Sequence, residues 1–186
     1  PLRIGFIGAG GNTRLRHLPG FAGIDGVELA AVANRSVESA QTVADEFSIV
    51  EAKTDWRQIV DDPNIDAVCI GTWPNTHAEM TIAALTAGKH VLVEARMADS
   101  LAAAEAMAAT AIRYPDLVAQ IVPAPFSLDA DTAIIKTIES GELGAMREVI
   151  SEFATSATAD VSAPLSWRLD ERTSGINMMG LGICYE

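Results

Sequence analysis

The sequence predicts an α/β fold in which a doubly wound parallel sheet is covered by helices on both faces. Two observations predict this fold. Apolar runs of strand length alternate with segments of helical periodicity over the first 122 residues. The first of these runs, Leu2–Ile7, leads directly into a glycine turn and then into a helical segment. This order is that of the βαβ unit that opens a Rossmann domain.

The first half of the predicted domain contains the better defined elements. Residues 12–18 are expected to be helical, with Pro19-Gly20 ending or kinking the helix. Residues 27–33 form a second apolar run, and residues 36–47 place Ala40, Val43, Ala44 and Phe47 on one helical face. A short strand near Ala52 and a helix at residues 56–60 complete this half.

The second half repeats the alternation. Residues 67–70, 90–93 and 117–122 are apolar runs that we expect to be strands. Thr76-His77-Ala78-Glu79 fits a capping box that opens a helix ending near Gly88, and residues 101–113 form an alanine-rich helix. Pro123-Ala124-Pro125 then interrupts the pattern, so we expect the Rossmann domain to cover residues 1–122.

The remaining residues, 123–186, predict the beginning of a second, α+β domain. Residues 131–140 are helical in pattern, and residues 148–158, rich in Ala, Ser and Thr, resemble a long strand. The glycine-bearing run at residues 175–182 follows, and the sequence ends at Glu186. We therefore expect a second domain of which only the first part is present.

Composition narrows the functional class. The 186 residues carry a net charge of −12 at pH 7, with no cluster of Lys and Arg larger than a pair, which argues against nucleic acid or an anionic membrane as partner. Cys69 and Cys184 form no disulfide framework, and no His or Cys spacing indicates a metal site. With a strand expected from residue 2 onward, we expect a cytoplasmic protein.

The glycine turn is the first candidate binding site. Gly8 would form the tight turn, and Gly10 would let the backbone approach a pyrophosphate. Gly11, Asn12 and Thr13 would open a helix whose N–H groups face the phosphates. Thr13 replaces the third glycine of the G-x-G-x-x-G pattern, and the alternative is an ordinary strand-to-helix turn.

The residues after the second strand predict which cofactor binds. Asn34-Arg35-Ser36 stands where an acidic residue would hold the ribose 2′-hydroxyl of NAD. An arginine beside a serine suits the 2′-phosphate of NADP instead, because a guanidinium can pair with two phosphate oxygens. We expect NADP, with NAD as the alternative if Arg35 is only a solvated loop residue.

Motifs along the whole chain resemble those of the Gfo/Idh/MocA family of glucose-fructose oxidoreductases and inositol dehydrogenases. The shared motifs are the N-terminal G-x-G turn, Thr54-Asp55-Trp56, Asp62-Pro63-x-x-Asp66-Ala67-Val68, Thr72-x-Pro74-Asn75-Thr76-His77, Ala87-Gly88-Lys89-His90-Val91, Gly141-Glu142-Leu143-Gly144 and Trp167-Arg168-Leu169-Asp170. The resemblance implies a second domain with an open mixed sheet and a nicotinamide cofactor between the two domains. It also implies a sugar, polyol or related small-molecule substrate, and a homo-oligomer formed through the second domain.

The resemblance also assigns further cofactor residues. It places Thr72, Pro74, Asn75 and His77 beside the ribose and nicotinamide, and Glu94 near the nicotinamide. His77 is equally well explained as a histidine bonded within the first helical turn, with proton transfer as the other possibility. Trp167 and Arg168 match a family pair near the cofactor and substrate, although Trp167 is also explained as a packing residue.

The sequence departs from the family at the catalytic positions. Family enzymes carry Glu-Lys-Pro where this chain has Glu94-Ala95-Arg96, and a later Asp and His correspond to Gly180 and Cys184. The usual acid and base are therefore missing. Glu94, Arg96 and His77 remain as catalytic candidates, and Arg96, Arg168 and Cys184 as substrate contacts.

These observations leave three hypotheses of function. The first is an NADP-dependent oxidoreductase acting on a carbonyl or alcohol. The second is a protein that binds the dinucleotide without catalysis, as a sensor or partner subunit. The third is a glycosidase that uses a bound nicotinamide transiently.

Overall fold

The computed structural model describes residues 1–123, 130–148, 150, 160 and 162–175. The chain forms two compact units. The first contains Pro1–Val122 and Ser166–Ile176, and the second contains Pro123–Leu165 and Asn177–Glu186. The break after Val122 lies where Pro123 was expected to begin a new domain. Ser166–Ile176, which lie within the expected second domain, belong to the first unit.

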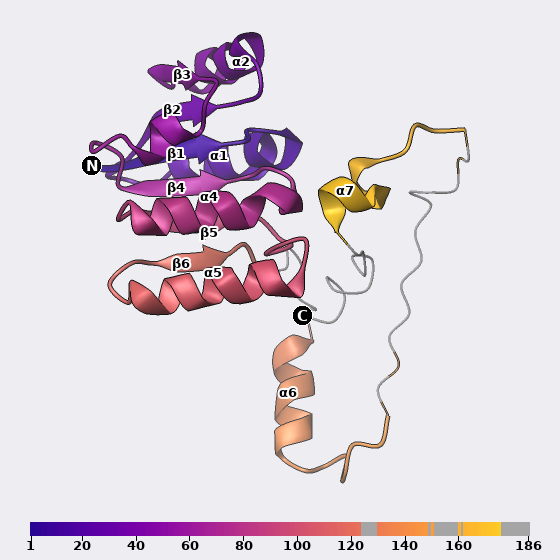
Figure 1. The fold of residues 1–186 in the computed structure, drawn as a ribbon. Coiled ribbons are helices and arrows are strands. Elements are labelled where there is room, and N and C mark those ends of the chain that lie inside the picture. Colours follow the sequence, from indigo (N-terminus) through magenta and orange to yellow (C-terminus); the bar gives the residue numbers. More distant parts are fainter. Residues whose placement is uncertain (124–129, 149, 151–159, 161, 176–186) are drawn as a thin grey trace. The chain divides into compact units, whose positions relative to one another are not determined.

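The first unit contains a parallel sheet of six strands in the order β3-β2-β1-β4-β5-β6 (Figure 1). The order reverses between β1 and β4, which is the arrangement of a Rossmann domain, so the fold prediction is confirmed. The strands are β1 (Leu2–Ile7), β2 (Val27–Ala33), β3 (Glu51–Lys53), β4 (Ala67–Ile70), β5 (His90–Val93) and β6 (Ala119–Ile121).

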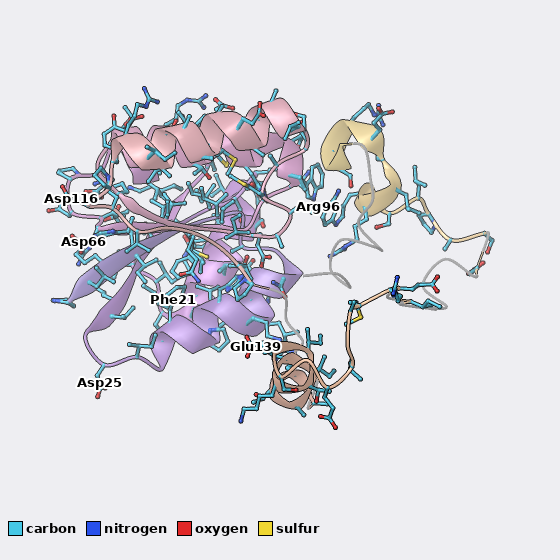
Figure 2. All side chains as sticks on the ribbon, turned by 90° about the horizontal axis from the view of Figure 1, so that it is seen from below. Phe21, Asp25, Asp66, Arg96, Asp116 and Glu139 are labelled. Atoms are coloured by element: carbon cyan, nitrogen blue, oxygen red, sulfur yellow. The ribbon has the colours of Figure 1, made fainter. Side chains whose placement is uncertain are left out.

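Helices cover the sheet and bury two separate cores. On one face, α1 (Leu18–Ala22) and α2 (Val37–Phe47) pack on residues such as Phe6 and Val32. On the other, α3 (Arg57–Val60), α4 (Pro74–Thr86) and α5 (Leu101–Arg113) pack on residues such as Ile7 and Val93. Phe21, labelled in Figure 2, meets Phe6 edge-on, with ring centroids 5.9 Å apart. Both faces are apolar because every central strand is buried on both sides.

Two predicted helix boundaries need correction: the helix does not end at Pro19, one of the two alternatives expected there, and the helix start predicted at Thr76 was wrong. The first helix continues beyond Pro19, because a π-helical turn, η1 (Thr13–His17), runs directly into α1. Pro19 lies at the second position of α1, where its fixed φ is compatible with the helix. Similarly, α4 begins at Pro74 and not with a capping box at Thr76. The fixed φ of Pro74 favours the first helical turn, so Thr76 and His77 already lie inside the helix.

The second unit is described only in part. It contains α6 (Asp131–Glu139), which ends one residue earlier than expected and leaves Ile134, Ile135 and Ile138 about half exposed. Most of the strand expected at residues 148–158 lies outside the described residues. In the described part of both units, no helix is long and apolar enough to cross a membrane.

The turn after β1 depends on a position that only glycine occupies without strain. Gly8 has a φ of +80°, and a Cβ there would lie 2.5 Å from Thr72 Cγ2 and 2.9 Å from Thr72 N. Gly26 has nearly the same φ, +82°, but a Cβ there would meet nothing within 4 Å. Alanine substitutions at the two glycines therefore distinguish the free-energy cost of the positive φ from the cost of a steric clash.

We expect Gly26→Ala to lower the free energy of unfolding by about 1 kcal/mol, which is the conformational cost alone. Gly8→Ala should cost roughly 3 kcal/mol or more, because the backbone at Thr72 must also move. Denaturant unfolding of the two variants measures the difference. An equal loss of unfolding free energy in both variants would show that the turn at Gly8 relaxes to accommodate a methyl group.

Candidate functional site

A cavity of about 550 Å³ lies at the carboxyl ends of the strands, beside the reversal point of the sheet. Gly8, Ala9 and Gly10 line one part of it, and a Cβ at Gly10 would project into open space. A ligand can therefore lie directly against the backbone of this turn. The other lining residues are Ile7, Ala33, Asn34, Arg35, Ser36, Ser39, Thr54, Trp56, Gly71, Thr72, Trp73, Thr76 and Met80.

Thr13 fits the position of the missing third glycine because β4 is also followed by a glycine. Thr13 is 1% exposed, and a Cβ at Gly71 would lie only 2.1 Å from its Oγ1. The Thr13 hydroxyl also donates a hydrogen bond to Gly8 O, at 3.2 Å. Gly71 thus supplies the space that a glycine at position 13 would otherwise provide. The helix after the turn still lies close to the strand ends.

Asn34 and Ser36 hold the backbone around the cavity. Asn34 Oδ1 accepts a hydrogen bond from Ala9 N at 2.8 Å, and its Nδ2 donates to Ser39 Oγ at 2.9 Å. Ser36 caps α2 by accepting from Ser39 N at 3.2 Å. Asn34 therefore fastens the glycine turn to the start of α2. Its place on the cavity wall agrees with the expected cofactor region, although its side chain is committed to protein atoms.

Arg35 lies exposed between these two residues and extends over Trp73. The guanidinium carbon of Arg35 is 4.6 Å from the centre of the Trp73 ring. Trp73 in turn stacks on Trp167, with centroids 6.4 Å apart and planes inclined by 25°. Arg168 covers the Trp167 ring at 4.4 Å. We call Arg35, Trp73, Trp167 and Arg168 the stacked column.

Sequence reasoning did not single out Trp73. The available signal was its position, because an aromatic residue directly after a buried strand and before a helix-opening proline lies at the ligand-binding edge of a parallel sheet. Trp167 belongs to η2 (Trp167–Leu169), which is followed by α7 (Glu171–Ser174). The structure thus brings the predicted residues Arg35, Trp167 and Arg168 together around a residue that was not predicted.

His77 is 1% exposed and connects two loops at the strand ends. Its Nδ1 lies 2.8 Å from Arg96 O, and its Nε2 lies 3.1 Å from Thr72 O. Burial lowers the pKa of His77, and this effect outweighs the two carbonyl acceptors and the nearby Glu94 charge, which raise it. The described contacts therefore favour a positioning role for His77 over proton transfer to a ligand.

Glu94 is the acceptor of two hydrogen bonds from the first helix. His17 Nε2 lies 2.5 Å from Glu94 Oε1, and Asn12 Nδ2 donates to the same oxygen. Burial raises the pKa of Glu94, but the bonds from His17 and Asn12, the His17 charge and the Ala95 N–H together hold it below its ordinary value. His17 was not identified from the sequence, because no sequence pattern indicates the π-helical turn that contains it.

Arg96 follows Glu94 and reaches the segment that contains α7. Its Nη1 donates to Ser174 O at 2.7 Å, and its Nη2 donates to Ser174 Oγ at 2.8 Å. The peptide bond between Ala95 and Arg96 is cis. Figure 2 shows Arg96 at the end of the sheet that faces this segment. Asn75 adds a further connection by donating to Arg172 O at 3.1 Å.

The remaining candidates from the sequence are the two cysteines, Gly180 and any group of metal ligands. Burial, with the Glu94 charge as a smaller cause, raises the pKa of the Cys69 thiol to about 12, so this cysteine is inert. Gly180 and Cys184 lie outside the described residues. Within the described residues, no group of three or more His, Cys, Asp or Glu side chains is placed to hold a metal ion.

The Glu94 carboxylate should make the stability of the protein depend on pH. Because its pKa in the folded state lies below the ordinary value of 4.5, its charged form stabilises the fold above that value. The contribution is lost as the pH falls through the folded pKa. We therefore expect Glu94→Gln to reduce the free energy of unfolding by about 1–2 kcal/mol at pH 7 and by much less near pH 3.

The measurement is denaturant unfolding of both proteins at several pH values. Glu79→Gln is the control, because the ion pair of Glu79 with Arg57 is mostly exposed and should contribute less than about 1 kcal/mol. A Glu94→Gln effect that stays constant down to pH 3 would contradict the prediction.

Comparisons with known proteins agree with this geometry. Residues 2–120 match the profile of the oxidoreductase family with an NAD-binding Rossmann fold, GFO_IDH_MocA. Levoglucosan dehydrogenase of Pseudarthrobacter phenanthrenivorans is 32% identical over 149 residues, which are 80% of this chain and 38% of that enzyme.

Two solved structures show the same architecture. An oxidoreductase domain protein from Kribbella flavida superimposes with a TM-score of 0.78 at 32% identity, over 92% of this chain and 48% of its own. A 3-ketoreductase from Actinomadura kijaniata, solved with NADP and TDP-benzene, gives 0.67 at 25% identity over 76% of this chain and 43% of its own. The chain spans less than half the length of each relative. Its fold, its glycine turn and these matches establish that it belongs to the Gfo/Idh/MocA family of NAD(P)-binding oxidoreductases.

Proposed function

We propose that this protein is an NADP(H)-dependent oxidoreductase that transfers hydride between nicotinamide and a sugar, polyol or other carbonyl-type substrate. The observation that carries the proposal is the cavity at the strand ends, which combines the glycine turn with Arg35 and Ser36. No carboxylate is present among the described residues that line it. A site of this kind accepts a pyrophosphate at one place and a further phosphate at another.

The residues of the cavity fit a dinucleotide. Gly8 and Gly10 let the pyrophosphate lie against the backbone, and the first turn after Gly10 presents N–H groups without intrahelical acceptors. Arg35 would hold the 2′-phosphate after leaving the face of Trp73. The bound nicotinamide would supply or accept the hydride. The protein would orient the substrate and handle the proton.

We assign the proton transfer that accompanies hydride transfer to the pair formed by Glu94 and His17. Both ring nitrogens of His77 lie against backbone carbonyl oxygens, and Ala95 cannot move a proton. Glu94 and His17 are each partly exposed, with 15% and 12% of the side chain accessible. They lie where β5 and the first helix meet at the ligand-binding edge. A carboxylate that holds a histidine ring is a common arrangement for acid–base catalysis.

The rival proposal is a protein that binds NADP(H) without catalysis. The commitment of His77 to backbone carbonyls, together with Ala95 in the lysine position, favours it. A nicotinamide-assisted glycosidase remains a less favoured proposal. Self-association through the second domain is a further proposal, which sedimentation of the full-length protein would test.

Arg35 should decide the cofactor preference. We expect Arg35→Gln to weaken NADPH binding roughly 10- to 100-fold, the equivalent of about 1.5–3 kcal/mol for a charge-assisted phosphate contact, and to leave NADH binding nearly unchanged. Cofactor titration by fluorescence measures both. Arg57→Gln is the matched control, because Arg57 also covers a tryptophan ring, Trp56, at 4.4 Å. Tighter binding of NADH than of NADPH by the unaltered protein would contradict the assignment.

Activity is tested by NADPH oxidation with the full-length protein and a panel of keto sugars, inososes, aldehydes and linear tetrapyrroles. We expect turnover with one of these classes, and His17→Gln should reduce kcat more than 10-fold. Tight NADPH binding without any turnover would favour the non-catalytic alternative. If His17→Gln kept the full rate, the proton assignment would be wrong.

A further inference from the structure

Two tryptophan rings line the cavity at the strand ends, and each is covered by an arginine. The two rings are Trp56 and Trp73. The guanidinium carbon of Arg57 lies 4.4 Å from the centre of the Trp56 ring, and that of Arg35 lies 4.6 Å from the centre of the Trp73 ring. A cation–π contact of an exposed arginine is weak, so a ligand can displace an arginine that has no other partner. The other contacts of the two arginines therefore determine which ring a ligand can reach.

The Arg57 guanidinium is held by two carboxylates, whereas the Arg35 guanidinium is not. Arg57 Nη2 donates to Glu79 Oε1 at 2.8 Å, and Arg57 Nη1 lies 3.5 Å from Asp55 Oδ1. Trp56 itself packs against the apolar core on its face of the sheet. Within the described part of the chain, no carboxylate pairs with Arg35. Arg35 is therefore the arginine that can leave its ring.

The Trp73 side chain is held by contacts that do not involve Arg35. Pro74 restricts Trp73 to an extended backbone, and the φ and ψ of Trp73 are −87° and 151°. The carbonyl oxygen of Trp73 accepts hydrogen bonds from Thr76 N at 3.0 Å and from Thr76 Oγ1 at 2.9 Å. Its ring stacks on Trp167, with centroids 6.4 Å apart. The indole is thus a preformed apolar surface that does not depend on the arginine covering it.

The covalent structure of NADP places its adenine beside the group that holds the 2′-phosphate. The adenine and the 2′-phosphate are attached to neighbouring carbons of the same ribose. If Arg35 binds the phosphate, the adenine lies next to Arg35, and the ring that Arg35 covers is that of Trp73. A purine has a π face that gains from stacking on an aromatic side chain. Movement of Arg35 to the phosphate would uncover such a ring where the adenine needs it.

We propose that Trp73 is the adenine-binding residue of the cavity, and that the adenine takes the place of the Arg35 guanidinium on the indole ring. This assignment rests on the proposed binding of NADP(H) and adds the base as a second recognised group. Arg35 distinguishes NADP from NAD through the 2′-phosphate. Trp73 binds the adenine that the two cofactors share, so it contributes affinity without selecting between them.

The test is calorimetric titration of the full-length protein with ADP-ribose and 2′-phospho-ADP-ribose, which lack nicotinamide and differ only in the 2′-phosphate. We expect Trp73→Leu to weaken the binding of both probes roughly 10-fold or more, because leucine is apolar but has no π face. Trp73→Phe should restore most of the affinity for both probes. Arg35→Gln should weaken the binding of 2′-phospho-ADP-ribose alone.

Trp56→Leu is the matched control, because Trp56 lines the same cavity under an arginine that Glu79 holds. We expect it to leave the affinity for both probes nearly unchanged. Tryptophan fluorescence gives a second measurement, since an adenine stacked on an indole quenches its emission. ADP-ribose should quench the emission of the unaltered protein and of Trp56→Leu, and most of this quenching should be lost in Trp73→Leu.

Several results would overturn the assignment of Trp73. They are unchanged binding of both probes by Trp73→Leu, an equal loss of affinity in Trp73→Phe and Trp73→Leu, and a larger loss in Trp56→Leu than in Trp73→Leu. Failure of the unaltered protein to bind either probe would also overturn it. Binding of both probes that depends on Trp73, in a protein without any turnover of NADPH, would contradict the oxidoreductase proposal and leave the adenine site in place.

Discussion

The close approach of two glycines at the strand ends determines the geometry of the whole site. β1 and β4 are adjacent where the strand order reverses, and both are followed by glycine. Gly8 leaves room for the backbone of Thr72, and Gly71 leaves room for the Thr13 side chain. Because neither contact tolerates a Cβ, the helix and the next loop come within reach of one ligand. The cavity between them follows from this packing.

The fold could be predicted because its signals are local. Each central strand is a continuous apolar run, and Gly8 follows the first of them, so the alternation of strands and helices was readable. The missing glycine at Thr13 could be noticed from the same pattern. Its compensation could not, because Gly71 belongs to another element and meets Thr13 only in the folded chain. The π-helical turn and the helix start at Pro74 depend on similarly non-local packing.

The candidate site, like the fold, could be predicted only in part from the sequence. Arg35 was singled out because it follows the second strand, and Glu94 because of its place in the family motif at the end of another strand. Parallel strands place their carboxyl ends together. Their partners were not found. His17, in the first helix, contacts Glu94, and Trp73 lies between Arg35 and Trp167. Ser174, far away in the sequence, accepts a hydrogen bond from Arg96. Sequence position indicates which edge a residue occupies, whereas the direction of its side chain depends on tertiary contacts.

The stacked column places two arginine side chains on tryptophan rings at the strand ends of an acidic protein. The protein has a net charge of −12, but at physiological ionic strength charges farther than about 8 Å are largely screened. Local groups therefore determine the potential at the strand ends. Arg35 covers Trp73, Arg168 covers Trp167, and the two rings stack on each other. We therefore expect phosphate binding at the glycine turn to depend on Arg35 and on backbone N–H groups, and not on the overall charge of the protein.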